Sequence, residues 1–170
     1  MNRHVEVEDY LKTIVKVGVV EEFFPASCTA IVRFPDEDNL KSRPLHVLHA
    51  NAGETRDFHV LARGENVLCL FLPTGRESGF ILGSLYRRPF TPAESDDHTR
   101  SVVFPDRARV SYDWEGKKLD VSCPGDITVS AQGNVSIMAS GTLTLAGLDG
   151  LEIETNGAGT MHGGTISIGE

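Results

Sequence analysis

The stretch Leu119–Ile153, LDVSCPGDITVSAQGNVSIMASGTLTLAGLDGLEI, decides the fold because one pattern recurs in it every eight residues. In each copy two aliphatic residues flank one polar residue, and the spacing is kept over five copies. Glycines fall on the same spacing at Gly133, Gly141 and Gly157, with Asp149–Gly150 at the skipped position. Each copy therefore predicts a short strand followed by a sharp turn. The aliphatic positions are Leu119, Val121, Ile127, Val129, Val135, Ile137, Leu143, Leu145, Leu151 and Ile153.

One such octad cannot fold alone. Its two aliphatic side chains share one face of a strand, and burying each contributes about 1.5 to 3 kcal/mol. Ordering the backbone costs about 1 to 2 kcal/mol per residue, and open strand edges would stay unpaired. Identical chains wound around one axis meet both needs, so we predict an intertwined β-helix in a closed homo-oligomer, with three chains in the best-known version and the ten aliphatic residues as its core. A single-chain solenoid or a plain β-sandwich is the alternative.

Charge is distributed unevenly along the chain. The sequence has 24 acidic residues and 16 Lys and Arg, for a net charge of −8. No Lys or Arg follows Lys118, whereas Asp120, Asp126, Asp149, Glu152, Glu154 and Glu170 do. A segment without Lys or Arg has little attraction for phosphates, so we expect no nucleic-acid binding by the residues that follow Lys118. Its acidic surface would let it pass anionic lipid or glycan, or serve only for solubility.

The first hundred residues combine one helical pattern with several strand patterns. Val7, Tyr10, Leu11 and Ile14 stand at helical spacing, which predicts a short N-terminal helix over residues 1–17. Five strands follow, separated by clusters of Pro, Gly, Asp and Asn, and they suggest a small closed barrel of the oligonucleotide/oligosaccharide-binding (OB) type. The predicted strands are Gly18–Phe24, Cys28–Phe34, Leu45–Ala50, Val67–Leu72 and Gly79–Tyr86.

A Pro-rich segment then separates the barrel pattern from the octads. It contains Pro89 and Pro92 and has no apolar periodicity, which is typical of a linker. The predicted organisation is therefore a helix over 1–17, a barrel over 18–88, a linker over 89–103 and a β-helix over 104–170. No stretch approaches the roughly 20 apolar residues of a membrane-spanning helix, and we expect synthesis in the cytoplasm. Cys28, Cys69 and Cys123 match no metal or disulfide motif and are expected to be small buried side chains.

Three stretches, taken in order, resemble the phage baseplate assembly protein V family, which forms the central spike of contractile tails. The first is PTGRESGFILGSLY over 73–86, similar to the last barrel strand of the family. The second is FPDRARVSYD over 104–113, similar to the turn and strand that lead into the family's spike, with Arg107 where Gly is usual. The octads are the third. Together they cover nearly the whole chain.

The resemblance implies a mechanical role rather than a catalytic one. It implies a homotrimer at the centre of the baseplate of a phage or a tailocin, assembled in the bacterial cytoplasm. The barrels would dock to a hub protein, and the β-helix would point toward the target cell. On sheath contraction, the spike would puncture the outer membrane. Similar spikes occur in type VI secretion machines.

The resemblance also directs attention to His162 in the sequence Met161-His162-Gly163. Many family members carry a His-x-His pair at the tip, where three chains hold one iron ion. With one histidine per chain, three His162 rings on the trimer axis would hold a metal ion, iron being the expected one. The structural alternative is a solvent-facing or stacked histidine. The strand pattern Thr165–Ile168 then ends bluntly, so we expect a separate cap that resembles the small PAAR-type tip proteins.

A second histidine cluster contains His46, His49, Asp57 and His59. His46 and His49 lie three apart on the predicted strand Leu45–Ala50, so their side chains are expected to point to opposite faces and not to share one ion.

Three functions compete. The first is the envelope-piercing spike, which is not an enzyme. The second is an OB module that binds a glycan or a nucleic acid and is trimerised by a β-repeat stalk. It needs aromatic platforms and cations on the barrel, whereas Phe58, Phe71, Phe80 and Tyr86 are expected in the core. The third is a glycan depolymerase, which needs two carboxylates across a groove.

Overall fold

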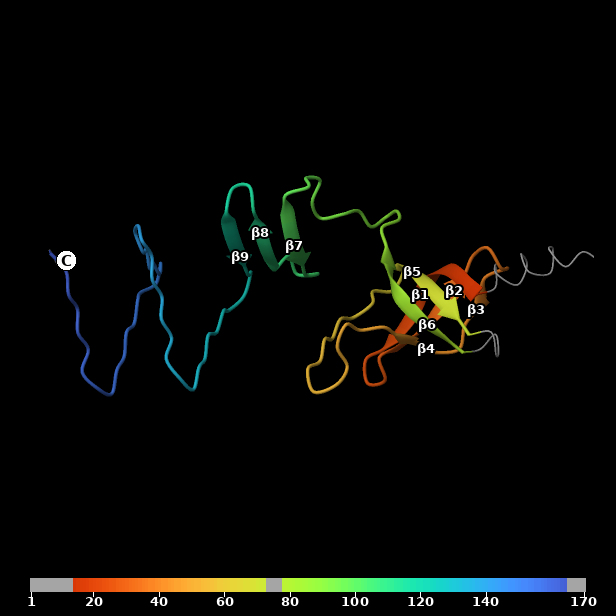
Figure 1. Ribbon diagram of the computed structural model, residues 1–170, viewed down its shortest axis with the longest axis horizontal. Helices are drawn as coiled ribbons and strands as arrows, with labels where there is room; N and C mark the ends of the chain where they lie inside the picture. The colour runs from red at the N-terminus through yellow and green to blue at the C-terminus, as the bar shows by residue number, and fades with distance from the viewer. Residues whose placement is uncertain (1–13, 73–77, 165–170) are drawn as a thin grey trace, which may run out of the picture. The chain divides into compact units, whose positions relative to one another are not determined.

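The computed structural model describes residues 14–72 and 78–164 of the 170-residue chain and is all-β in these residues. The chain divides into two compact units, Met1–Pro124 and Gly125–Glu170. All strands of the described residues lie in the first unit (Figure 1). They are β1 (Val15–Phe24), β2 (Thr29–Phe34), β3 (Leu40–Lys41), β4 (Leu45–Val47), β5 (Asn66–Phe71), β6 (Gly79–Leu85), β7 (Thr99–Val103), β8 (Arg109–Asp113) and β9 (Lys118–Ser122).

Five of these strands form a closed, OB-like barrel. The order around it is β1-β5-β6-β4-β2, and pairing of β1 with β2 closes the ring. Only β4 and β6 run parallel among the barrel pairs. β1 closes the barrel because its first half pairs with β5 and its second half with β2, with a register shift between Val20 and Glu22. Such a bulge bends a strand, as barrel closure requires. The predicted small barrel is confirmed.

The barrel core follows from strict alternation along the strands. Ala30, Val32 and Phe34 of β2 face inward, and Val67, Cys69 and Phe71 of β5 do the same. These side chains pack with those of the neighbouring strands into one hydrophobic cluster, completed by Val20, Leu45, Val47, Leu61 and Ile81. Cys69 is thus a small buried side chain as expected, whereas Cys123 is exposed, which corrects that expectation. Burial raises the pKa of the Cys69 thiol to about 12, so it stays protonated.

The predicted N-terminal helix falls mostly on residues 1–13, which lie outside the described residues. Its predicted end is wrong, because Val15–Val17 already belong to β1 and pair with Leu68–Leu70 of β5. Among the described residues, no helix combines the length and the apolar character needed to cross a bilayer.

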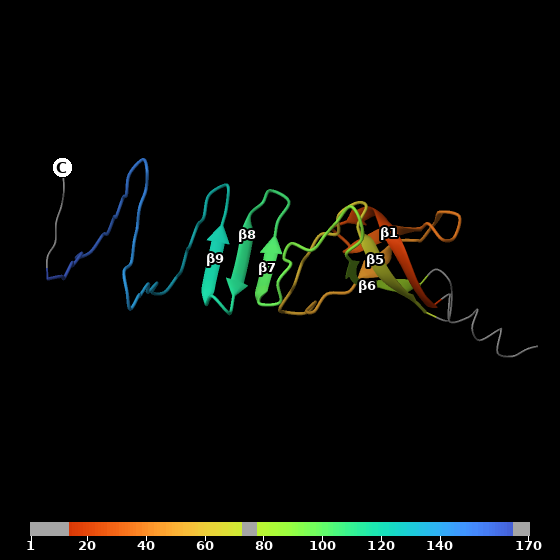
Figure 2. The ribbon, with the colours of Figure 1, turned by 90° about the horizontal axis from the view of Figure 1, so that it is seen from above.

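A separate three-stranded antiparallel sheet follows the barrel in the chain, in the order β7-β8-β9 (Figure 2). β7 occupies Thr99–Val103, the last part of the segment predicted as a linker, so the linker is shorter than expected. Every β7 residue pairs with one of β8, from Thr99 with Asp113 to Val103 with Arg109. The strand is formed by this pairing, since its own sequence, TRSVV, has no apolar alternation.

The turn between β7 and β8 keeps a glycine-like conformation without glycine. Arg107 has φ 73°, in the left-handed region. The Arg107 N–H donates to the Phe104 carbonyl at 2.9 Å, and the Ala108 N–H donates to Asp106 Oδ1 at 3.0 Å. The turn geometry is therefore held by hydrogen bonds at both sides of the strained residue.

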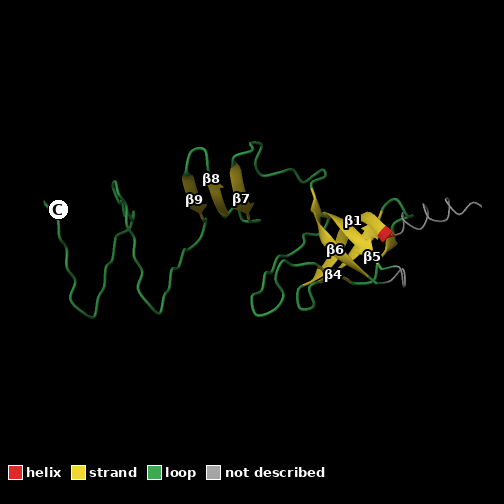
Figure 3. Ribbon diagram, in the orientation of Figure 1, coloured by secondary structure: helices red, strands yellow, loops and turns green. Residues whose placement is uncertain are grey.

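The described residues of the second unit, 125–164, form no strand and are drawn as loop in Figure 3. They consist of extended segments separated by backbone bends. The bends lie at residues 124–125, 132–133, 140–141, 148–149, 156–157 and 164. The eight-residue period of the sequence is thus also a period of the backbone.

Candidate assembly surface

The three-stranded sheet presents an apolar face to solvent. The register aligns Val102 with Val110 and Val110 with Val121, and it pairs Tyr112 with Leu119. All five of these side chains are 42% exposed or more. The same face also carries Arg100, which pairs with Tyr112, whereas the other face carries Ser101, Ser111 and Asp120 together with Val103. The sheet therefore has one mainly apolar face that is uncovered in the single chain, which makes it a candidate interaction surface.

The aliphatic pairs of the octads are exposed as well. The ten predicted core residues are all exposed in the single chain, from 51% for Leu143 to 77% for Val129. Leu119 and Val121 lie on β9 and share its apolar face, as the two-residue spacing predicts. The structure therefore places the aliphatic pairs where a partner can cover them, while the single chain leaves them uncovered.

Residues 125–164 of the second unit have neither strand pairing nor a hydrophobic core in the single chain. Its described residues are extended, belong to no strand and bury none of their large hydrophobic side chains. Extended backbone needs hydrogen-bond partners, and apolar side chains need a core, before the ordering entropy is offset. Partner strands would supply both.

His162 is exposed and lies in this unit near the end of the described residues. Among the described residues, no group of three or more His, Cys, Asp or Glu side chains is positioned to hold a metal ion within one chain. The predicted strand Thr165–Ile168, at which a cap would bind, lies outside the described residues. The acidic residues Asp126, Asp149, Glu152 and Glu154 are exposed, as is Asp120 of β9.

His98, which was not among the predicted functional residues, connects the segment before β7 to the sheet. His98 Nδ1 lies 3.2 Å from Asp113 Oδ1 and 3.4 Å from Asp96 Oδ1, and its Nε2 lies 3.5 Å from Glu115 Oε2. The Trp114 N–H also donates to the His98 carbonyl at 3.1 Å. The sequence Asp96-Asp97-His98 is the one feature of the sequence that indicates this contact.

Two carboxyl groups at this contact are stabilised in the charged form. Hydrogen bonds from the Gly116 and Glu115 N–H groups and from His98 lower the pKa of Asp113 below its ordinary value, although desolvation opposes them. Desolvation also acts on Asp96, but hydrogen bonds from Thr99 and His98 outweigh it and lower the pKa of Asp96.

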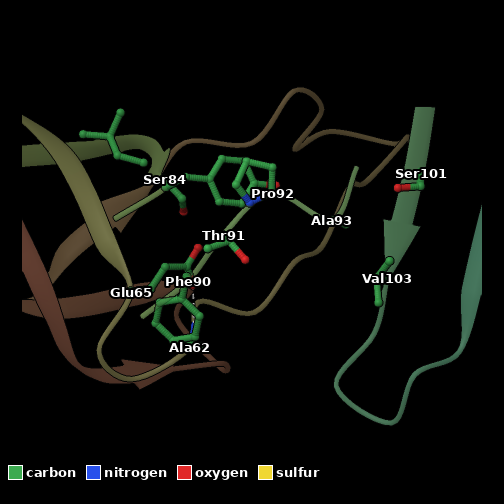
Figure 4. A pocket seen from close by; sticks show the side chains of 11 residues that line it. Ala62, Glu65, Ser84, Phe90, Thr91, Pro92, Ala93, Ser101 and Val103 are labelled. Carbon is green, nitrogen blue, oxygen red and sulfur yellow. Dashed lines mark hydrogen bonds between the residues drawn. The ribbon is translucent and has the colours of Figure 1, made fainter. Parts of the chain in front are cut away.

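An apolar groove of about 630 Å³ is lined by residues of the barrel, of the segment that follows β6 and of β7. Figure 4 shows Phe90, Thr91 and Pro92 of that segment among the lining side chains, with Glu65 and Ser84 of the barrel. Glu65 is the one carboxylate among the lining residues of this groove.

Two aromatic side chains that were expected in the barrel core are exposed instead, and the barrel also carries a cluster of cationic side chains. Phe71 is buried, but Phe58 and Tyr86 are 59% and 68% exposed, so their predicted core positions are wrong. Arg33, Lys41 and Arg63 line one depression with Glu21. Lys41 Nζ lies 2.6 Å from Glu21 Oε1, and this hydrogen bond is the main reason why the pKa of Glu21 is lowered.

The second histidine cluster is only partly assembled. His46 lies on β4, paired with Thr29 and Phe80, whereas His49 follows the end of that strand. The structure brings His49 next to His59 instead, with ring centroids 4.7 Å apart.

No protein-family model matches the chain, and no curated protein matches it significantly.

Proposed function

We propose that this chain is the central spike of a contractile tail, acting as a homotrimer that punctures the outer membrane of a target bacterium. One observation carries the proposal. Backbone bends recur at the same eight-residue period as the exposed aliphatic pairs, so chain geometry and apolar pattern are in phase. A segment of this kind is stable once identical chains cover each other's pairs and edges.

The proposed role divides the chain into a docking part and a piercing part. The OB-like barrel would bind a hub protein of the baseplate. The octads would form the intertwined β-helix, and their acidic, cation-free surface would reduce adhesion to anionic lipid and glycan. A PAAR-like tip protein, or a metal ion held by three His162 rings, would close the end. None of these steps requires the chain to be an enzyme.

The test is the solution mass of the full chain by light scattering, beside a chain that stops at Pro124. The cut at Pro124 follows the boundary between the two units and keeps β9, which a cut at Lys117 would remove. We expect the full chain to have three times its mass of 18.5 kDa, and the shortened chain to lose this state. A full-length monomer would refute the intertwined β-helix and, with it, the piercing function.

A second candidate, a binding module on a trimeric stalk, is favoured by the exposed Phe58 and Tyr86 and by the cations around Glu21. Proteins that bind single-stranded nucleic acid combine aromatic stacking platforms with cationic side chains. A fluorescence titration with a mixed-sequence single strand and with an acidic oligosaccharide distinguishes the two functions. Saturable binding lost in Tyr86→Ala would favour the module, and no binding would favour the spike.

A further inference from the structure

The long connection between β4 and β5 folds back on itself as a small hairpin. It is visible as the orange loop that leaves the barrel after β4 (Figure 1). Ala52 and Arg56 form an antiparallel bridge. The Asp57 N–H donates to the Asn51 carbonyl at 2.9 Å, and Arg56 Nε donates to the Gly53 carbonyl at 3.1 Å. Connections of this length are uncommon and often functional.

The register of this hairpin places two histidines opposite each other. Residue 52 faces 56 and residue 51 faces 57, so the same register brings 49 opposite 59. The His49 and His59 rings are indeed in contact, with centroids 4.7 Å apart and planes inclined by 59°. Because side chains alternate between faces along extended backbone, Asp57 is on the same face as His59, and Asn51 on the same face as His49.

His49 has polar atoms that this surrounding does not satisfy. Both ring nitrogens are shielded from solvent, and neither has a hydrogen-bond partner among the described residues. A shielded polar group without a partner costs about 1 to 3 kcal/mol. Such a group needs an explanation, of which a bound ion is one.

We propose that His49 and His59 together bind one divalent transition-metal ion per chain. Two imidazole nitrogens suit Zn²⁺, Ni²⁺ or Cu²⁺ rather than Ca²⁺ or Mg²⁺, which prefer oxygen ligands. Since the described side chains do not position three His, Cys, Asp or Glu ligands at one point, water completes the coordination. His59 is exposed, so an ion can enter between the two rings.

Asp57 has the position of an outer partner for such an ion. Its Oδ2 accepts a hydrogen bond from Asn51 Nδ2 at 2.8 Å, which orients the carboxylate on the hairpin face that carries His59. A carboxylate in this position would hold a metal-bound water or the second nitrogen of an imidazole. The hairpin thus supplies two ligands and an oriented anion from a stretch of eleven residues, 49–59.

The site does not depend on the proposed spike function. All of its residues belong to one barrel, so a full trimer would bind three ions at these hairpins. A tip site built from three His162 rings would bind one ion per three chains. The number of ions bound per chain therefore distinguishes the two sites, and evidence against one site is not evidence against the other.

The experiment is equilibrium dialysis of the untagged full chain against Zn²⁺, beside His59→Gln, His49→Gln and the matched controls His98→Gln and His162→Gln. We expect one ion per chain in the wild type and in both controls. Loss of a ligand should weaken binding by at least the roughly 10- to 100-fold that an outer partner contributes. Cu²⁺ in place of Zn²⁺ should give an electron paramagnetic resonance spectrum with two imidazole nitrogens.

Three results would overturn the proposal. The first is no binding by the wild type up to millimolar Zn²⁺. The second is unchanged affinity in His59→Gln, a change at an exposed side chain whose fold is checked by circular dichroism. The third is one ion per three chains that disappears in His162→Gln, which would assign the ion to the tip.

Discussion

Arg107 carries backbone strain that glycine would remove. Its φ of 73° costs an L-residue about 1 to 2 kcal/mol, a cost that glycine avoids. Glycine recovers only part of this free energy, because its unfolded chain has more conformational freedom to lose on folding. We therefore predict that Arg107→Gly stabilises the three-stranded sheet by about 1 kcal/mol. The fluorescence of Trp114, the single tryptophan, reports on this sheet during denaturant unfolding. Arg107→Ala is the control, because it removes the side chain but keeps the strain; an equal gain in both variants would refute the explanation.

Gly18 is required where β1 crosses β2. A Cβ at this position would overlap Val32 Cγ1 and lie 2.9 Å from both the Arg33 carbonyl oxygen and the Phe34 ring. Because backbone cannot yield easily, we predict that Gly18→Ala destabilises the barrel by about 1 to 3 kcal/mol. Gly83→Ala is the matched control, since a Cβ there meets nothing within 4 Å. Thermal unfolding followed by circular dichroism should separate the two variants, and equal melting temperatures would contradict this packing.

At the scale of elements, the contact of His98 with the β8–β9 hairpin should be sensitive to acid. The pKa of Asp113 is lower in the folded chain than its ordinary value of 3.8, mainly through the Gly116 N–H. A carboxyl with a lowered pKa stabilises the fold above its unfolded pKa, and the contribution is lost as pH falls through the folded value. Asp113→Ala should thus lower stability at pH 6, and this loss should shrink as the pH falls below the ordinary pKa of 3.8. Trp114 fluorescence in urea measures both, and a pH-independent difference would show that Asp113 acts through packing.

Substitutions at two neighbouring octad positions test which face of the segment lies inside the proposed trimer. Val135 and Ile137 share one face of an extended segment, and Ser136 between them points to the other. If the aliphatic face lies inside a trimer, Val135→Asp buries a charge and should dissociate or misfold the oligomer. Ser136→Asp adds the same charge to the outer face and should leave the mass unchanged. Light scattering compares the two, and equal behaviour would refute the assigned faces.

The alternation of inward and outward residues along each strand predicted the barrel strands well. The features that were not predicted depend on pairing between two segments of the chain. Strands such as Cys28–Phe34 were expected almost as found, because inward and outward residues alternate within each strand. β7 was missed because only its register with β8 makes it a strand. The contact of His49 with His59 was missed for a similar reason, since the Asn51–Asp57 bonds create the hairpin. The β-helix stays a prediction, because its pairing would be between chains.

At the scale of the whole molecule, the two units should differ in how they fold. The barrel forms from pairings within one chain, with β1 joined to β2 and β5. The octads would gain their stability from other chains, and long-range pairing must then precede the hydrophobic gain. We therefore expect the full chain to assemble slowly and at a rate that rises with protein concentration.

Once formed, such a trimer should be kinetically stable, because many inter-chain pairs must break before any chain leaves. The apparent melting temperature of the full chain should then rise with scan rate, and heating and cooling curves should not coincide. A chain that stops at Pro124 lacks four of the five octad pairs and should melt and refold along one curve. Calorimetry at several scan rates and concentrations measures both chains. A full chain that melts reversibly at low temperature, independent of concentration, would place its stability in the barrel alone and would be incompatible with a spike that transmits force.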